Sequence, residues 1–182
     1  MTIVERRAET EWGPTAPLTP DEEANLATVA AVVPHWNRQD AAAVVAFYTP
    51  DIVWHNVAMG EVYTGRAQVQ AFLDELFVAL PDLRLDVTFR APRGRYVAEE
   101  YVITGTHRGP MFGLPGTGRR VELHAVSMVQ MHEGRFAVDH FYFDAASAMR
   151  DMGYFPDAAL AYTRPARIVL GLVARVIRRR VR

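Results

Sequence analysis

The stretch that decides the fold runs from Tyr96 to Asp144 and reads YVAEEYVITGTHRGPMFGLPGTGRRVELHAVSMVQMHEGRFAVDHFYFD. Three segments within it, 96–107, 119–131 and 135–143, alternate in hydrophobicity and are rich in β-branched and aromatic residues. This pattern predicts three long antiparallel strands. A glycine- and proline-rich connection joins the first two, and His132-Glu133-Gly134 predicts a tight hairpin turn between the last two. A long curved sheet of this kind needs a cover from elsewhere in the chain.

The residues before this stretch predict that cover. Thr19-Pro20-Asp21-Glu22 matches a helix start, with threonine as the cap, proline at the first helical position and a glutamate that closes a capping box. Pro34 is expected to kink or end this helix, and Asp40 to cap a second, short one. Strands are expected at 52–57 and 83–91, with a third helix between them at 66–80. A short helix is expected after Asp144. Helices grouped ahead of a mostly antiparallel sheet predict an α+β fold, with the helices on one face and a conical cavity beneath them.

Length and composition predict one domain with two extensions. The 182 residues divide into a loose arm at 1–18, a domain at 19–153 and a basic extension, expected to be helical, at 154–182. There is no cysteine and no lysine in the chain. Disulfides, thiolate chemistry, Schiff-base catalysis and a P-loop lysine are therefore excluded.

Charge is unevenly distributed along the chain. Seven arginines lie after Thr163, so the remainder carries 13 arginines against 21 acidic residues. We expect the tail at 164–182 to pack on the acidic body or on a dimer partner; the alternative is contact with an anionic membrane surface. An acidic body without an aromatic platform argues against nucleic-acid binding. With no signal-peptide pattern at the N-terminus and no membrane-spanning run, a cytoplasmic location is expected.

Four short motifs resemble those of a known family. They are PDIVWH at 50–55, TGTHRG at 104–109, GLPGTGR at 113–119 and EGR at 133–135. With the order of elements, they resemble the SnoaL-like polyketide cyclases over roughly residues 20–153. That family lies in the nuclear-transport-factor-2-like superfamily. The resemblance implies its cystatin-like fold, a cone-shaped, curved antiparallel sheet covered by N-terminal helices, which serves enzymes and binding proteins alike.

The resemblance also implies an activity and its residues. The cyclases close a polyketide ring by intramolecular aldol condensation without metal or cofactor. They use an aspartate on the last strand and a histidine on the strand before it. Alignment through Gly134 places these at Phe141 and Ser127.

Residues 53–56 and 142–144 also resemble parts of a second family, the limonene-epoxide hydrolases. Those enzymes activate water with an Asp–Arg–Asp triad, whose positions fall on Val102, Glu100 and Phe141. Neither family's catalytic set is therefore retained in this chain.

Two carboxylates are the candidate catalytic residues. Asp139 lies two positions before Phe141, so the strand period points it into the same cavity, where an apolar setting would raise its pKa and suit it as a general base. Alignment places Glu100 inward on the strand 96–107, where it would be the protonated partner of Asp139. The alternatives are an edge-exposed Asp139 paired with an arginine, and a solvated Glu100 or one paired with Arg135.

The candidate substrate-binding residues are Trp54, Asn56, His107, Ser127 and Phe141. Trp54 would stack on a planar substrate and Asn56 would orient a water or a carbonyl, with core packing and a backbone hydrogen bond as the alternatives. A bulge after Gly105 would carry His107 into the pocket, with a purely structural histidine as the alternative.

These residues predict a cofactor-independent acid/base enzyme that cyclises or isomerises a small, mainly apolar, polyketide-like substrate. The chain is expected to form a homodimer and to use no metal or cofactor. Two alternatives stay open: an epoxide hydrolase with altered catalytic residues, and a binding module that does not catalyse. A carboxylate pair facing a common cavity would favour an enzyme.

Overall fold

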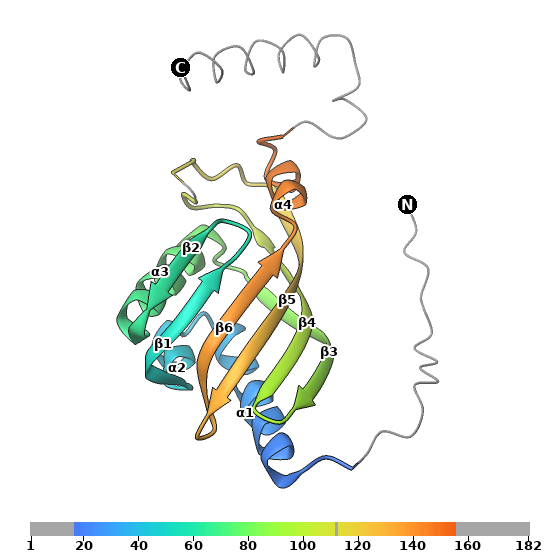
Figure 1. The fold of residues 1–182 in the computed structure, drawn as a ribbon. Helices are drawn as coiled ribbons and strands as arrows, with labels where there is room; N and C mark the ends of the chain where they lie inside the picture. The colour runs from blue at the N-terminus through green and yellow to red at the C-terminus, as the bar shows by residue number, and fades with distance from the viewer. Residues whose placement is uncertain (1–16, 112, 156–182) are drawn as a thin grey trace, which may run out of the picture.

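The computed structural model describes residues 17–111 and 113–155 (Figure 1). The predictions for the arm at 1–18 and for the basic extension at 154–182 fall almost wholly outside these residues. The helices are α1 (Pro20–Trp36), α2 (Ala41–Val45), α3 (Gly65–Ala79) and α4 (Ala145–Asp151). The strands are β1 (Tyr48–Asn56), β2 (Glu61–Thr64), β3 (Arg84–Arg93), β4 (Tyr96–Thr106), β5 (Arg120–His132) and β6 (Arg135–Phe143).

The strands form one six-stranded curved sheet in the order β2-β1-β6-β5-β4-β3. Every neighbouring pair is antiparallel except β1 and β6, which run parallel. Helices α1, α2 and α3 lie on one face of the sheet (Figure 1). The predicted α+β fold is therefore confirmed. After β1 the chain turns back in a hairpin, in which β2 adds an edge strand beside β1.

Local signals explain where the elements begin and turn. Glu22 N donates to Thr19 Oγ1 at 3.3 Å and Thr19 N donates to Glu22 Oε2 at 2.9 Å, so the predicted capping box starts α1. Pro34 does not end α1, which continues to Trp36. Glu133 and Gly134 both have positive φ, 48° and 70°, as a two-residue hairpin turn that follows the twist of its strands requires.

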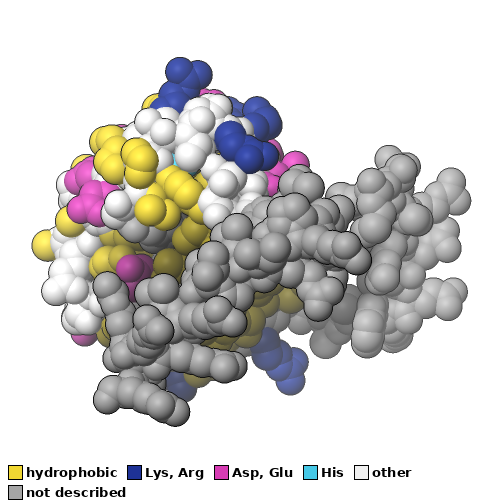
Figure 2. All heavy atoms as spheres, turned by 90° about the horizontal axis from the view of Figure 1, so that it is seen from above, with side chains coloured by type: hydrophobic (Ala, Val, Ile, Leu, Met, Phe, Trp, Pro, Cys, Tyr) yellow, Lys and Arg dark blue, Asp and Glu magenta, His cyan; other side chains and the backbone are white. Residues whose placement is uncertain are grey.

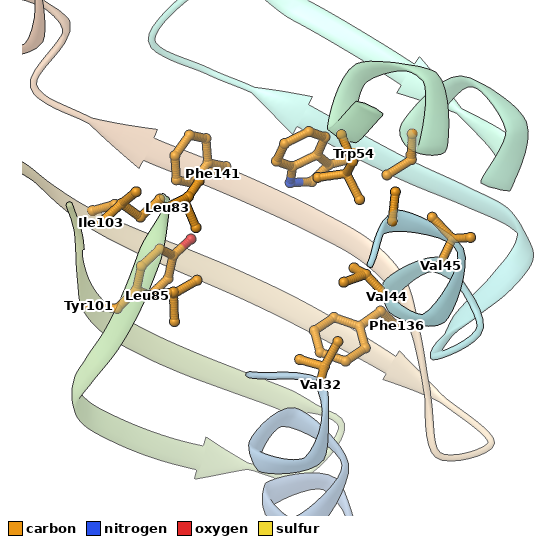
Figure 3. Packing of buried hydrophobic residues seen from close by; sticks show 14 of the residues in the cluster. Val32, Val44, Val45, Trp54, Leu83, Leu85, Tyr101, Ile103, Phe136 and Phe141 are labelled. Carbon is orange, nitrogen blue, oxygen red and sulfur yellow. The ribbon is translucent and has the colours of Figure 1, made fainter. Parts of the chain in front are cut away.

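The core lies between the helices and the concave face of the sheet. Figure 3 shows side chains from both layers meeting there, with Val32 and Val44 from the helices and Phe136 and Tyr101 from the strands. These four residues are buried, at 7 % exposure or less. Burial of such side chains is the main stabilising contribution, since each is worth about 1.5–3 kcal/mol relative to full exposure.

The opposite face of the sheet is not covered by the described residues (Figure 1). Val126, Met128 and Tyr142 are 38 %, 42 % and 44 % exposed there. The register pairs Val126 with Tyr142 and Met128 with His140, so these side chains are neighbours on one surface. A contiguous apolar surface of this kind is typical of a protein contact. None of the described helices is long and apolar enough to cross a membrane.

Candidate functional site

A cavity of about 640 Å³ lies between the helices and the concave face of the sheet. Its wall is mainly apolar and aromatic, with Trp36, Leu85 and Ile103 among the lining residues. Pro110, Met111 and Gly113 lie at its mouth, where the connection between β4 and β5 was expected. Figure 2 views the molecule from this end and shows hydrophobic side chains gathered around a hollow. The size and lining suit a small, mainly apolar ligand.

Three of the predicted binding residues lie in the cavity wall. They are Trp54, Asn56 and Phe141. The register places Asn56 of β1 directly opposite Phe141 of β6. Figure 3 shows Trp54, Phe141 and Tyr101 directed toward the same interior space. Ser127 and His107 are buried but are not part of the wall.

Asp139 lies on the inner face of β6 but is not among the residues that line the cavity. It is 6 % exposed and sits opposite Trp54 on the neighbouring strand. Burial raises the pKa of this carboxyl from 3.8 to about 7; the nearby Ser127 and Trp54 lower it, and the charge of Glu99 raises it. Neither Asp139 Oδ1 nor Trp54 Nε1 has a hydrogen-bond partner among the described residues. A carboxyl in this setting exchanges a proton near neutral pH.

The prediction that Glu100 points inward is wrong. The inward side chains of β4 are Val97, Glu99, Tyr101 and Ile103, and Glu100 is exposed on the outer face. Side chains of a strand alternate between its two faces, so either the odd-numbered or the even-numbered residues of β4 can face inward. Because acids stand at both 99 and 100, the sequence alone does not decide which of the two is buried. The buried acid is Glu99, whose Oε1 accepts from Arg90 Nε at 2.6 Å. Burial raises the pKa of Glu99 and the bond to Arg90 lowers it.

Tyr101 connects the cavity to this buried region. Its side chain lines the cavity, and its hydroxyl is 2.9 Å from Ser127 Oγ. Ser127 also lowers the pKa of Asp139, so this serine acts on both groups. Burial, and then the charge of Asp139, raise the pKa of Tyr101 well above 10, so this tyrosine stays neutral and can donate a hydrogen bond. Tyr101 was not among the predicted site residues. It would have been one if the odd-numbered residues of β4 had been predicted to face inward.

A second polar group lies at the β1–β2 end of the cavity. Glu61 Oε2 accepts hydrogen bonds from Asn56 Nδ2 at 3.1 Å and from the Tyr63 hydroxyl at 2.9 Å. All three residues line the cavity. Burial, and then the bond to Glu61, raise the pKa of Tyr63. No strand was predicted at residues 61–64, so Glu61 and Tyr63 were not among the predicted site residues.

His107 has a structural position rather than one in the wall. Its ring is buried, Nδ1 is 3.2 Å from Thr117 Oγ1, and its backbone N–H donates to Arg119 at 2.8 Å. Burial lowers the pKa of His107 and keeps the ring neutral. These contacts fix the base of the connection that forms the cavity mouth. In residues 17–111 and 113–155, no three side chains of metal-ligating type converge on one point.

Comparisons with known proteins agree with this fold. A family model described as SnoaL-like polyketide cyclase matches residues 27–152. A SnoaL-like protein from Jannaschia sp. CCS1 has a similar structure, with a TM-score of 0.69 and 24 % identity, covering 78 % of this chain and 100 % of that one. IdmH from Streptomyces antibioticus gives a TM-score of 0.60 at 23 % identity, covering 71 % of this chain and 98 % of that one. No curated protein matches the chain.

The family model spans most of the chain and all the elements that build the cavity. The chain therefore belongs to the SnoaL-like polyketide cyclase family, and its fold is of the nuclear-transport-factor-2-like type. A neighbour described as having a ketosteroid isomerase-like fold, from Catenulispora acidiphila, covers 77 % of this chain with a TM-score of 0.63 at 18 % identity. At these identities the similar structures establish the fold, and the activity has to be argued from the site.

Proposed function

We propose that the chain is a cofactor-independent acid/base enzyme that cyclises or isomerises a small, mainly apolar, polyketide-like substrate. The observation that carries the proposal is that the Tyr101 hydroxyl contacts Ser127, and that Ser127 in turn lowers the pKa of the buried Asp139 carboxyl. We interpret these three residues as a polar path from the cavity wall to that carboxyl. This path takes the place of the aspartate that the family has at Phe141. Asp139 itself does not line the cavity, so Tyr101 is the group that would touch substrate.

The proton balance of a cyclisation fits this arrangement. The enol carbon of a β-dicarbonyl substrate attacks a second carbonyl, and a carbon–carbon bond forms. The neutral Tyr101 hydroxyl protonates the carbonyl oxygen as it gains charge, and Asp139 replaces that proton through Ser127. The enol hydroxyl releases one proton to water, and the ionised Asp139 takes one back. A pKa of about 7 populates both forms of Asp139 at neutral pH, as proton transfer in both directions requires.

Turnover of linear β-polyketo esters, followed by mass spectrometry of the products, tests the proposal. We expect Tyr101→Phe and Asp139→Asn each to lower kcat by about 10²–10⁴-fold with little change in KM, because both act on the proton and not on the apolar contacts. Glu100→Gln, which removes an acid from the outer face of the same strand, is the control and should keep full activity. An unchanged kcat for Tyr101→Phe would refute the path.

A second candidate is a small-molecule binding module without turnover. Its support is that Asp139 and Ser127 lie behind the wall and not in it. Binding of the same esters without product from the unaltered protein would favour this candidate. Epoxide hydrolysis has less support, since Val102 and Glu100 lie on the outer face and Phe141 is apolar.

A further inference from the structure

Asn56, in the cavity wall at the β1–β2 end, carries a buried hydrogen-bond acceptor without a partner among the described residues. Asn56 is 2 % exposed, and its Nδ2 donates to Glu61 Oε2 at 3.1 Å. A carboxylate accepts hydrogen bonds, so the amide nitrogen of Asn56 must face Glu61 and the amide oxygen must face elsewhere. That oxygen, Oδ1, is buried and has no partner among the described residues. Buried polar atoms are almost always paired in native proteins, so Asn56 Oδ1 indicates a missing donor.

The charged groups around this acceptor have one sign. Glu61, Asp74 and Glu75 line the cavity, and no arginine or histidine is among its described lining residues. Glu61 is the nearest, and both of its hydrogen bonds are made through Oε2, from Asn56 and Tyr63. These charges favour a cation and oppose an anion in a cavity with an apolar wall, where charges are screened less than in water.

The aromatic side chains beside Glu61 favour the same kind of ligand. Trp54, Tyr63 and Phe72 form a cluster with ring centroids 4.8–5.8 Å apart, and all three line the cavity. Tyr63 joins this cluster to the carboxylate through its hydroxyl. Aromatic faces attract cations, by about 0.5–2 kcal/mol depending on how far the cation is desolvated.

We infer that this end of the cavity binds a protonated amine of the ligand. An N–H of the ammonium donates to Asn56 Oδ1, the charge lies against Glu61, and the carbon skeleton extends past Trp54 and Phe141 into the apolar part. The inference rests on the proposed function only in taking the cavity as the ligand site. It adds that the substrate carries an amino group, held beside β1 and β2.

Equilibrium binding tests this without any turnover. The probes are 1-naphthylmethylammonium, 1-naphthylmethanol and 1-naphthoate, which share an aromatic body and differ in the charge of one group. Titration calorimetry on the full chain should give the ammonium the tightest binding, by on the order of tenfold over the alcohol, and the carboxylate the weakest. Glu61→Gln should lower ammonium affinity about tenfold and leave the alcohol within about threefold. Glu100→Gln, an equal change of charge on the outer face, should leave all three affinities unchanged.

A second variant separates the acceptor from the charge. Asn56→Val removes Oδ1, suits a strand and should reduce the preference for ammonium over alcohol even if Glu61→Gln folds poorly. Equal affinity for ammonium and alcohol in the unaltered protein would overturn the inference and leave the proposed function standing, with water as the partner of Asn56. No binding of any probe would overturn both the inference and the cavity as a ligand site. Loss of product from Tyr101→Phe with ammonium binding intact would support both.

Discussion

Replacing Asp139 by asparagine removes a charge that the fold buries at a cost, and we predict that the variant is more stable than the unaltered protein at pH 8. The pKa of Asp139 is about 7 in the fold against 3.8 for an ordinary aspartate. Each pKa unit is worth about 1.4 kcal/mol, so ionising this carboxyl costs the folded state up to about 4 kcal/mol. Asparagine has nearly the same shape and carries no charge to bury.

The sign of the pH dependence follows from the raised pKa. The folded state holds the proton of Asp139 more tightly than the unfolded state does, so the stability contributed by this group is full below about pH 4. It is lost as the pH rises through about 7. The asparagine variant has no such loss. Its gain in free energy of unfolding is therefore expected to be about 2–3 kcal/mol larger at pH 8 than at pH 5.

Urea unfolding at pH 5 and pH 8, followed by circular dichroism, measures this difference. Glu133→Gln is the matched control, since it removes an exposed carboxylate in the turn between β5 and β6 and should change stability by no more than about 0.5 kcal/mol at either pH. If the asparagine variant and the unaltered protein show the same difference between the two pH values, Asp139 is not buried at a cost and the reasoning fails. If Asp139→Asn is more stable than the unaltered protein but inactive, the native aspartate lowers the stability of the fold and supplies a group that exchanges protons.

Two further predictions concern an ion pair and the outer face of the sheet. Arg90→Leu leaves Glu99 buried without its partner and should lower the free energy of unfolding in urea by about 2–4 kcal/mol. Adding Glu99→Leu should restore most of that loss, and additive losses from the two substitutions would contradict the coupling. We also predict that the chain forms a homodimer through the exposed apolar face of the sheet. Met128→Glu should then sediment as a folded monomer, whereas the control Val62→Glu, at an exposed position of β2, should sediment as a dimer. A monomeric unaltered protein would rule out this interface.

The buried carboxyl of the site is not at the position where the resemblance predicts the family's aspartate. Phe141, which the motif alignment predicts at the position of the family's aspartate, forms part of the apolar wall. The carboxyl at 139 is on the same strand and the same face, but it does not line the cavity, whereas Trp54, Tyr101 and Phe141 do. A carboxyl can act at this depth only through a relay, which makes Tyr101 the critical residue.

Several features were determined by the sequence alone, because they depend on residues close together in the chain. Thr19 with Glu22 sets the start of α1, and Glu133 with Gly134 sets the last hairpin, since each needs only its own neighbours. The alternation of the strands and the grouping of helices ahead of them were enough to predict the α+β fold.

The site was decided by the tertiary structure, because it depends on contacts between distant residues and on the phase of one strand. Period two allows β4 only two phases, and packing against the helices chose the one that buries Glu99 and Tyr101 and exposes Glu100. The bond from Tyr101 to Ser127 joins residues 26 apart in sequence. The pKa of Asp139 comes from burial, which no local pattern encodes, because a carboxyl is desolvated only when other elements close over it.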